Sequence, residues 1–547
     1  MIPLRFLSQK LELTITWILL SCLFSVVFAR SSNRPADTER QLLNWSVPMA
    51  ASLLAARFLS SKYKPKKQVE NTDKTMTFKH DRGETKLVPL VPKSNKKKLK
   101  KYTMAEVAKK CTPDDLWIII QGRVYDITNY VDKHPGGKLV LNSMGGKDCT
   151  DVFANYHQAR VYQTMLPAYC IGEIGNPSEV YPHVKDFRQI EQDLLQQGLF
   201  ETDQQYYRNM YLWLASIFIA SLYCSLYLSS TASHMFGAVL MGFFWQQFAG
   251  IGHDIGHSSV SHNFYTDHFN GSLYGCLFMG ISTGWWKRTH NLHHVVCNSI
   301  ENDPDVQHMP VLAVSPKFIE KPFWSTYHKR LMQMDSITAF FVRNQHILFF
   351  PLMAVARFNL YIQSWIMIFN KDFKMYNRGV EAAGLTFFIV WVLSLALCMN
   401  SWFESVAWVL LSHAVAGILH IQIVISHWAM ETYSGSAYNN ADDEWYKMQL
   451  ATTMNVDCYE WMDFLHIGLQ FQIEHHLFPM LPRHNLRKAR KMVKQVCEKH
   501  GIPYHEKSFY EAVKCTYDLL CVTAAKARAG DYLKVPNLIA DGMNAQG

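Results

Sequence analysis

The sequence predicts a multi-domain protein in which a small α+β domain precedes an all-α membrane domain with about four transmembrane helices arranged as two hairpins. Residues 99–177 contain short β-type segments and a glycine-rich turn, which are typical of a small α+β domain. Residues 208–251 and 382–426 are nearly free of charge and long enough for paired membrane helices. Three histidine clusters near these apolar segments predict a metal-binding cap on the membrane domain.

The N-terminal 98 residues differ in composition from the rest of the chain. Residues 1–60 resemble a targeting or signal-anchor segment, because Arg5 and Lys10 precede an apolar run that ends near Ala29. An upstream start codon is the alternative. Residues 61–98 are rich in lysine and predict a basic linker.

Two histidines mark the small domain at 99–177. A strand is expected at 116–120, and His134 follows in a His-Pro-Gly-Gly turn. His157 lies 23 residues later, beyond a helical stretch. Two imidazoles on opposite faces of a haem give a six-coordinate electron carrier without a free site for oxygen. An incidental histidine in a glycine-rich turn is the alternative, but the whole pattern resembles cytochrome b5, which implies haem b bound by His134 and His157.

The membrane domain is predicted at 208–525, after an amphipathic linker at 178–207 and before a tail at 526–547. We expect membrane spans at about 208–228, 234–251, 382–400 and 404–426. The loops at 229–233 and 401–403 contain no Lys or Arg, so the positive-inside rule places them on the lumenal side. Each hairpin then returns the chain to the cytosolic side, where the histidine clusters meet.

Two further apolar segments do not fit the pattern of a simple span. Residues 269–286 are rich in glycine and aromatic residues, and we expect a re-entrant or interfacial segment there. Residues 346–369 contain Arg357 and Asn359 near their centre, so we expect them on the membrane surface.

The histidine clusters are HDIGH at 253–257, HNLHH at 290–294 and QIEHH at 472–476. Spacings of three and four residues place imidazoles on one helical face. Seven imidazoles exceed the four ligands of a usual zinc site, and nitrogen ligation with open positions favours two iron ions. The predicted metal ligands are His253, His257, His290, His293, His294, Gln472, His475 and His476, with His427 as a further candidate. No catalytic side chain is predicted beyond these ligands.

Acidic residues near the clusters are candidates to accept the outward N–H groups of the imidazoles. These residues are Asp254, Asp303, Asp305 and Glu474. For Glu474 a solvent-facing position is the alternative. Asn298 is expected to orient its neighbours.

The order of these parts resembles the front-end lipid desaturases, in which a cytochrome b5 domain is fused ahead of a membrane di-iron domain and the third histidine box begins with Gln. The resemblance covers about 100–525. The sequences at 290–299, 302–308 and 469–479 look closest to sphingolipid Δ8 desaturases, whereas LPRHNL at 481–486 is similar to acyl-chain Δ5 and Δ6 desaturases. DFLHIG at 463–468 departs from the usual Δ8 pattern, which leaves the position of the double bond open.

The resemblance implies an oxidoreductase that inserts a double bond at Δ8 of sphingolipid long-chain bases. The alternatives are a Δ5 or Δ6 fatty acyl desaturase, a hydroxylase on the same scaffold, and a non-catalytic, membrane-tethered haem electron carrier. The implied partners are a lipid from the bilayer, dioxygen and NADH-cytochrome b5 reductase. The expected location is the endoplasmic reticulum membrane with the haem and iron sites cytosolic, and a plastid membrane is the alternative.

Charge and cysteine content limit the other function classes. The net charge of +9 comes from Lys and Arg near the N-terminus and in the C-terminal part, which favours loops near anionic lipid. No aromatic-basic or helix-turn-helix pattern is present, so we expect no nucleic-acid partner. The twelve cysteines form no CxxC pair, which predicts reduced thiols.

Overall fold

The computed structural model describes residues 99–157, 159–177, 179–435, 437–438 and 444–530. The predicted targeting segment, the basic linker up to residue 98 and the tail from residue 531 lie outside the described residues. The chain divides into two units made of segments distant in sequence. Unit 1 consists of 201–286 and 349–422, and unit 2 consists of the described residues within 99–200, 287–348 and 423–530.

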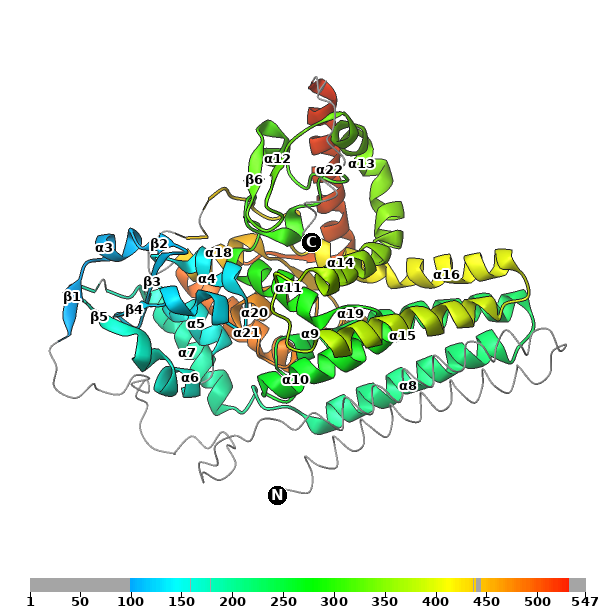
Figure 1. The fold of residues 1–547 in the computed structure, drawn as a ribbon, viewed down its shortest axis with the longest axis horizontal. Coiled ribbons are helices and arrows are strands. Elements are labelled where there is room, and N and C mark those ends of the chain that lie inside the picture. The colour runs from blue at the N-terminus through cyan, green and yellow to red at the C-terminus, as the bar shows by residue number, and fades with distance from the viewer. Residues whose placement is uncertain (1–98, 158, 178, 436, 439–443, 531–547) are drawn as a thin grey trace. The chain divides into compact units, whose positions relative to one another are not determined.

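Unit 2 begins with an α+β domain built on a five-stranded sheet, shown in blue and cyan in Figure 1. The strands are β1 (Lys100–Tyr102), β2 (Cys111–Thr112), β3 (Asp115–Ile120), β4 (Arg123–Asp126) and β5 (Cys170–Ile174). Their order is β1-β5-β4-β3-β2, with β1 and β5 parallel and the other pairs antiparallel. The predicted strand at 116–120 is confirmed as β3, whose Leu116 and Ile120 are fully buried.

Short helices surround this sheet, and two of them position the histidines of the small domain. They are α3 (Met104–Ala108), η1 (Thr128–Lys133), α4 (Lys138–Met144), α5 (Thr150–Tyr156), α6 (Ala159–Thr164) and η2 (Leu166–Tyr169). His134 directly follows η1 and His157 directly follows α5, each as the C-cap of its helix. The α+β architecture predicted for this region is therefore confirmed.

The amphipathic segment after the small domain forms α7 (Pro182–Gln196), which packs against α21 (Leu486–His500) within unit 2. Apolar residues recur along α7 with helical spacing, and Val184, Phe187 and Leu194 are fully buried. The remaining elements of unit 2 are η4 (Pro304–Val306), α12 (Lys317–Glu320), β6 (Phe323–Ser325), β7 (Arg330–Met332), α18 (Glu444–Thr452), β8 (Asn455–Asp457), η5 (Glu460–Met462), α19 (Asp463–His466), α20 (Gln472–Leu477), η6 (Arg483–Asn485), β9 (Glu506–Ser508) and α22 (Phe509–Ala529).

Unit 1 contains the long apolar helices, and α9 packs against both α8 and α16 (Figure 1). Its elements are α8 (Gln204–Leu226), α9 (Thr231–Gly256), α10 (Phe264–Asn270), η3 (Gly271–Met279), α14 (Arg357–Phe369), α15 (Arg378–Leu397) and α16 (Trp402–Ala416). Three helices pass from one unit's residues to the other's: α11 (Thr283–Val296), α13 (Ser336–Val355) and α17 (Ile418–Val424).

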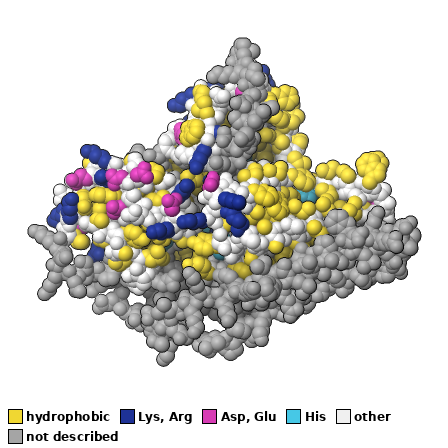
Figure 2. All heavy atoms as spheres, viewed as in Figure 1, with side chains coloured by type: hydrophobic (Ala, Val, Ile, Leu, Met, Phe, Trp, Pro, Cys, Tyr) yellow, Lys and Arg dark blue, Asp and Glu magenta, His cyan; other side chains and the backbone are white. Residues whose placement is uncertain are grey.

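Among the described residues, four helical segments are long and apolar enough to cross a membrane: α8, α9, α15 and the continuous pair α16–α17. They confirm the four spans and two hairpins predicted from the sequence. The hairpin tips are joined, because Asn400 Nδ2 donates to the Ser229 carbonyl at 2.8 Å and His234 lies 3.1 Å from Glu404. Hydrophobic side chains gather over α14 and α16 in Figure 2, and Trp402, Phe403 and Leu410 are among those exposed. Exposed apolar faces of this kind suit contact with lipid.

The segment expected to be re-entrant or interfacial, 269–286, contains the π-helix η3 and is largely buried in unit 1. Polar side chains satisfy the carbonyls at the end of η3. Trp391 donates to Leu277 and Trp245 to Phe278, each at 2.9 Å, and the Arg357 guanidinium donates to Met279 at 2.7 Å. Irregular backbone is tolerated at membrane depth when the protein itself supplies such partners.

The segment expected on the membrane surface, 346–369, consists instead of parts of α13 and α14, which meet at a bend of 64°. Arg357 is fully buried beside the bend rather than placed at an interface. Its guanidinium donates to Tyr361 Oη at 2.7 Å and lies over the Trp245 ring. Tertiary contacts therefore accommodate a charge that the sequence alone suggested should face water.

A buried carboxylate supports the start of α11, the helix that contains the second histidine cluster. Glu381 on α15 is fully buried and accepts hydrogen bonds from the hydroxyls of Ser272 and Ser282. The backbone N–H of Gly284 also donates to it, at 3.2 Å. An anion at a helix N-terminus is stabilised by the helix dipole.

We expect Glu381→Ala to destabilise the protein, because three buried donors lose their acceptor and each costs about 1–3 kcal/mol when unsatisfied. The expected drop in melting temperature is several degrees, at about 2–4 °C per kcal/mol. Thermal unfolding of detergent-purified protein, followed by size-exclusion chromatography, measures it. Thr386→Ala, at an exposed position of the same helix, is the control. An unchanged midpoint for Glu381→Ala would contradict this role.

Candidate haem and metal sites

His134 and His157 face each other in the α+β domain. Their ring centres are 6.0 Å apart. Two imidazoles bonded to one iron from opposite sides, each through a nitrogen about 2 Å from the metal, have ring centres about 6 Å apart. The pair therefore fits the axial ligands of a haem.

Backbone carbonyls hold the other nitrogen of each ring. His134 Nδ1 lies 3.3 Å from the Gly137 carbonyl, and His157 Nδ1 lies 3.0 Å from that of Phe153. Donation from Nδ1 leaves Nε2 of each ring as the ligand atom. Burial lowers the pKa of His134 to about 4 and that of His157 to about 3, so both rings are neutral, the form that binds a metal.

Three imidazoles of unit 2 converge through their Nε2 atoms. His290 and His294 lie on α11, and His475 lies on α20. His294 Nε2 is 3.0 Å from His290 Nε2 and 3.0 Å from His475 Nε2. Two nitrogens bonded to one ion at about 2.1 Å and at right angles to each other are about 3 Å apart. These three residues therefore fit one metal ion.

A second group in unit 2 consists of His293, Cys297, His427 and His476. One potential ligand atom of each lies within 4.8 Å of the others, and all four residues are buried. The ring centre of His427 lies 4.7 Å from that of His293 and 4.9 Å from that of His476. The structure thus places His427, the further candidate from the sequence, among residues of the second and third clusters.

Outer acceptors face the Nδ1 atoms of this second group. His293 Nδ1 donates to Asp303 Oδ2 at 2.9 Å, and His427 Nδ1 lies 3.3 Å from the Thr452 carbonyl. His476 Nδ1 lies 2.9 Å from Gln449 Oε1. Each contact selects the tautomer that leaves Nε2 for a metal and holds the ring in place.

Carboxylates make the environment of His293 different from that of its neighbours. Burial lowers its pKa, but the charges of Asp303 and Asp305 and the hydrogen bond that His293 donates to Asp303 outweigh burial and raise the pKa to about 9. His427 Nδ1 faces the Thr452 carbonyl instead of a carboxylate, and burial together with the nearby His293 lowers its pKa to about 3. Asp303 and Asp305 therefore stabilise positive charge at His293, on the side of the second group that faces these two carboxylates.

The first histidine cluster lies in unit 1, at the end of α9. The rings of His253 and His257 are 4.8 Å apart, as their i, i+4 spacing on one helical face predicts. The Trp286 indole lies against both rings, at 5.6 and 5.5 Å. Gly256 permits this approach, because a Cβ there would lie 1.9 Å from the indole.

The four acidic residues predicted to accept imidazole N–H groups lie in different environments. Asp303 contacts His293 directly, whereas Asp305 lies 3.9 Å from His290. Asp254 accepts from the Tyr207 hydroxyl at 2.8 Å. The solvent-facing alternative for Glu474 is wrong, since this residue is fully buried and accepts from Asn455 Nδ2 and Tyr504 Oη.

Asn298 connects the end of α11 to the His427 segment. Its Nδ2 donates to the His427 carbonyl at 2.8 Å, and its backbone N–H donates to Asp303 at 2.7 Å. Its φ of 61° is a left-handed conformation that asparagine tolerates. Gln472, predicted beside the metal, is buried at the start of α20, one turn before His475.

Sequence reasoning missed Gln449 and Cys297. Besides facing His476, Gln449 donates to the His294 carbonyl at 2.8 Å, although 155 positions separate the two residues. Cys297 Sγ lies 3.5 Å from His427 Nδ1. The sequence does contain a pattern that could have identified Cys297, because this residue lies four positions after His293 and so shares its helical face. No local pattern identifies Gln449.

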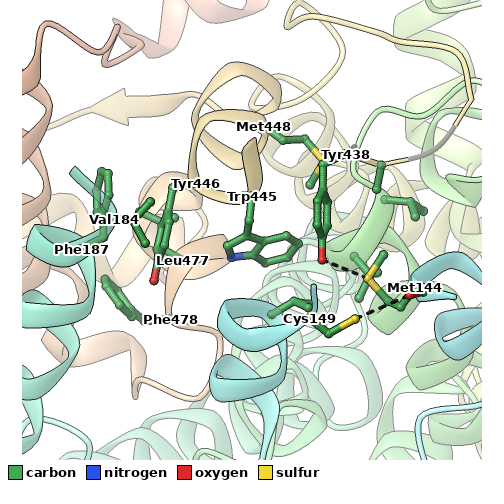
Figure 3. Packing of buried hydrophobic residues seen from close by; sticks show 14 of the residues in the cluster. Met144, Cys149, Val184, Phe187, Tyr438, Trp445, Tyr446, Met448, Leu477 and Phe478 are labelled. Carbon is green, nitrogen blue, oxygen red and sulfur yellow. Dashed lines mark hydrogen bonds between the residues drawn. The ribbon is translucent and has the colours of Figure 1, made fainter. Parts of the chain in front are cut away.

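Aromatic and sulfur-containing residues join the α+β domain to the rest of unit 2 (Figure 3). Tyr438 Oη donates to the Asp148 carbonyl at 2.8 Å. Phe187 of α7 stacks on Tyr446 at 4.7 Å, and Trp445 lies between Tyr438 and Tyr446 in Figure 3. Leu477 and Phe478, which follow the third histidine cluster, belong to the same buried group. This core fixes the histidine pair of the α+β domain relative to α20.

Comparison with protein families matches residues 229–508 to fatty acid desaturases and residues 103–175 to the cytochrome b5-like haem/steroid-binding domain. The chain is 38% identical to an acyl-lipid (9-3)-desaturase of Borago officinalis, over 82% of this chain and 99% of the relative. It is 36% identical to Delta(8)-fatty-acid desaturase 1 of Arabidopsis thaliana over the same shares. It is 40% identical to a Delta 8-(E)-sphingolipid desaturase of Emericella nidulans over 49% of each chain.

We expect His134→Ala and His157→Ala each to abolish the low-spin absorption spectrum of a bis-imidazole haem, because each removes one axial ligand. Visible spectra of purified protein in the oxidised and reduced states measure this. His505→Ala, which changes a half-buried histidine outside the α+β domain, should leave the spectrum unchanged. A normal spectrum in either of the first two variants would exclude that residue as a ligand.

We expect Asp303→Asn to reduce metal affinity by about 10–100-fold, because His293 loses its charged outer acceptor. Asp305→Asn should have a smaller effect, since the Asp305 carboxylate lies 3.8 Å from His293. Elemental analysis after dialysis against a graded series of chelator concentrations measures the affinities. Equal iron retention by Asp303→Asn and the parent protein would contradict the assignment.

Proposed function

The chain belongs to the fatty acid desaturase family and includes a cytochrome b5-like domain, and from this premise we propose that it inserts a Δ8 double bond into the long-chain base of sphingolipids. It is a membrane oxidoreductase with a histidine-box metal site. The proposal extends this coarser activity to a substrate and a bond position.

The observation that carries the proposal is the arrangement of imidazoles in unit 2. His290, His294 and His475 converge there through Nε2, and His293, His427 and His476 form a second group whose three rings have outer acceptors. Two groups suit two ions, and nitrogen-rich ligation suits iron. We assign the ligands to His253, His257, His290, His293, His294, His427, His475 and His476, with Gln472 at or near the iron.

Desaturation removes two hydrogens from adjacent methylene groups. One dioxygen, two electrons and two protons are consumed, and the products are one double bond and two molecules of water. Bound iron would supply the reductive activation of dioxygen, which amino-acid side chains cannot provide. The protein contributes burial that excludes water, together with Asp303, Gln449 and Thr452, which keep the imidazoles in one orientation.

Two features favour a sphingolipid base over an acyl chain as substrate. The sequence next to the second and third histidine clusters looks closest to the sphingolipid Δ8 desaturases. The Emericella nidulans relative, whose name specifies a sphingolipid, has the highest identity of the three relatives described above.

A fatty acyl substrate is the second candidate, because the Borago officinalis acyl-lipid desaturase matches over nearly its full length. Desaturation at Δ5 or Δ6 is the activity to test under this alternative. The third alternative, a non-catalytic haem carrier, is wrong, since the family match and the assembled histidine groups identify an enzyme.

The source of electrons and the membrane location are further parts of the same proposal. We assign haem b to His134 and His157, and NADH-cytochrome b5 reductase as the donor to that haem. The fused domain raises the local concentration of the electron carrier at the iron site. We place the protein in the endoplasmic reticulum membrane with both sites on the cytosolic side, and a plastid membrane is the alternative.

The test is lipid analysis of yeast that lacks Δ8-unsaturated bases and expresses the full chain, with C18 and C20 fatty acids supplied. We expect a new Δ8-unsaturated long-chain base, detected by mass spectrometry. His475→Ala should produce none, because it removes one of the three convergent Nε2 atoms.

New Δ5 or Δ6 fatty acids with unchanged long-chain bases would move the enzyme to the acyl substrate. A hydroxylated base in place of the alkene would show that the scaffold transfers oxygen to the substrate. Haem and iron in the purified protein confirm that the expressed enzyme is complete.

A further inference from the structure

Tyr156 connects the haem-ligand pair to the metal-binding histidines within unit 2. It is the last residue of α5 and directly precedes His157. Its ring centre lies 6.4 Å from that of His294, with the ring planes at 84°. His294 is in turn the histidine whose Nε2 lies 3.0 Å from those of both His290 and His475. One side chain and one ring contact therefore span the distance from the His157 peptide to the metal-binding group.

The structure holds α5 in place at its other end. Arg188 of α7 donates to both carboxylate oxygens of Asp151, at 2.7 and 3.0 Å. The Tyr446 hydroxyl also donates to Asp151, at 3.3 Å. Since α5 has only seven residues, fixing Asp151 also fixes the position of Tyr156. The ring contact with His294 is therefore a built feature of the domain interface.

The hydroxyl of Tyr156 is buried and has no hydrogen-bond partner among the described residues. Oxidation of a tyrosine to its neutral radical requires an acceptor for the phenolic proton. Without such an acceptor, the ring suits electron passage in which Tyr156 itself is neither oxidised nor deprotonated.

We propose that Tyr156 is the bridge through which electrons pass from the haem domain to the histidine-bound metal centre. This inference rests on the proposed function, because it requires a haem between His134 and His157 and iron at the histidine groups. Each transfer oxidises ferrous haem to ferric haem and reduces one ferric ion of the metal centre to ferrous. Two such transfers supply the two electrons of one desaturation, and no proton moves at Tyr156.

An aromatic ring is suited to this position for a physical reason. Electronic coupling decays less steeply through bonds and π systems than across an open gap. The route from His157 to Tyr156 is covalent, and one ring contact completes it to His294. An aliphatic side chain at 156 would preserve burial but widen the gap between conjugated groups.

The experiment measures haem oxidation directly in the full-length, iron-loaded protein. The haem is reduced anaerobically with dithionite, the protein is mixed with oxygenated buffer and lipid substrate, and the haem absorption band is followed by stopped flow. Tyr156→Phe should reoxidise at nearly the parental rate, because it keeps the ring. Tyr156→Leu should slow to the rate of an iron-free preparation, with its haem spectrum, midpoint potential and iron content unchanged.

Tyr438→Leu is the matched control, since Tyr438 is a buried tyrosine at the same domain interface but bonds to the Asp148 carbonyl. Equal slowing in Tyr438→Leu would overturn the proposal, because domain docking would then explain the effect. Parental haem oxidation in Tyr156→Leu would overturn it as well. Slowing specific to Tyr156→Leu in a protein that makes no Δ8 base would support the bridge and refute only the substrate assignment.

Discussion

The outward hydrogen bonds of the buried imidazoles are the interaction on which the rest of the site depends. Histidines whose Nε2 atoms converge have only Nδ1 with which to fix the ring, and in a buried site water does not provide the partner. Asp303, Gln449 and the Thr452 carbonyl each face one such nitrogen. These partners come from two segments far apart in sequence, because Asp303 precedes η4 whereas Gln449 and Thr452 both lie on α18. The two segments must therefore fold together before the rings are held.

Buried polar groups in unit 1, which contains the membrane-spanning helices, also need hydrogen-bond partners from the protein. The π-helix η3 leaves carbonyls that lipid cannot satisfy, and two indoles and one guanidinium donate to them. Glu381 satisfies the start of α11 in the same way. Buried polar residues that look unfavourable in an apolar sequence therefore stabilise the helix that contains His290, His293 and His294.

The cytochrome b5-like domain is part of unit 2 rather than a module on a free tether. Its α5 is held by Arg188 and Tyr446, and the aromatic core that includes Trp445 also contains residues that follow the third histidine cluster. Fusion alone would raise the local concentration of the electron carrier. Packing adds a fixed orientation, which keeps Tyr156 against His294.

The sequence by itself determined the features that depend on local periodicity. Histidines at i and i+4 predicted the shared face of His253 and His257, apolar length predicted the four spans, and the pattern around His134 and His157 indicated a facing pair of imidazoles. Tertiary structure alone decided which polar residues support these groups. Gln449 meets His294 across 155 positions, Glu474 is buried against Asn455 and Tyr504, and α13 bends away from α14. Such contacts produce no periodic pattern in the sequence, because they join distant segments that come close in space only when the chain folds.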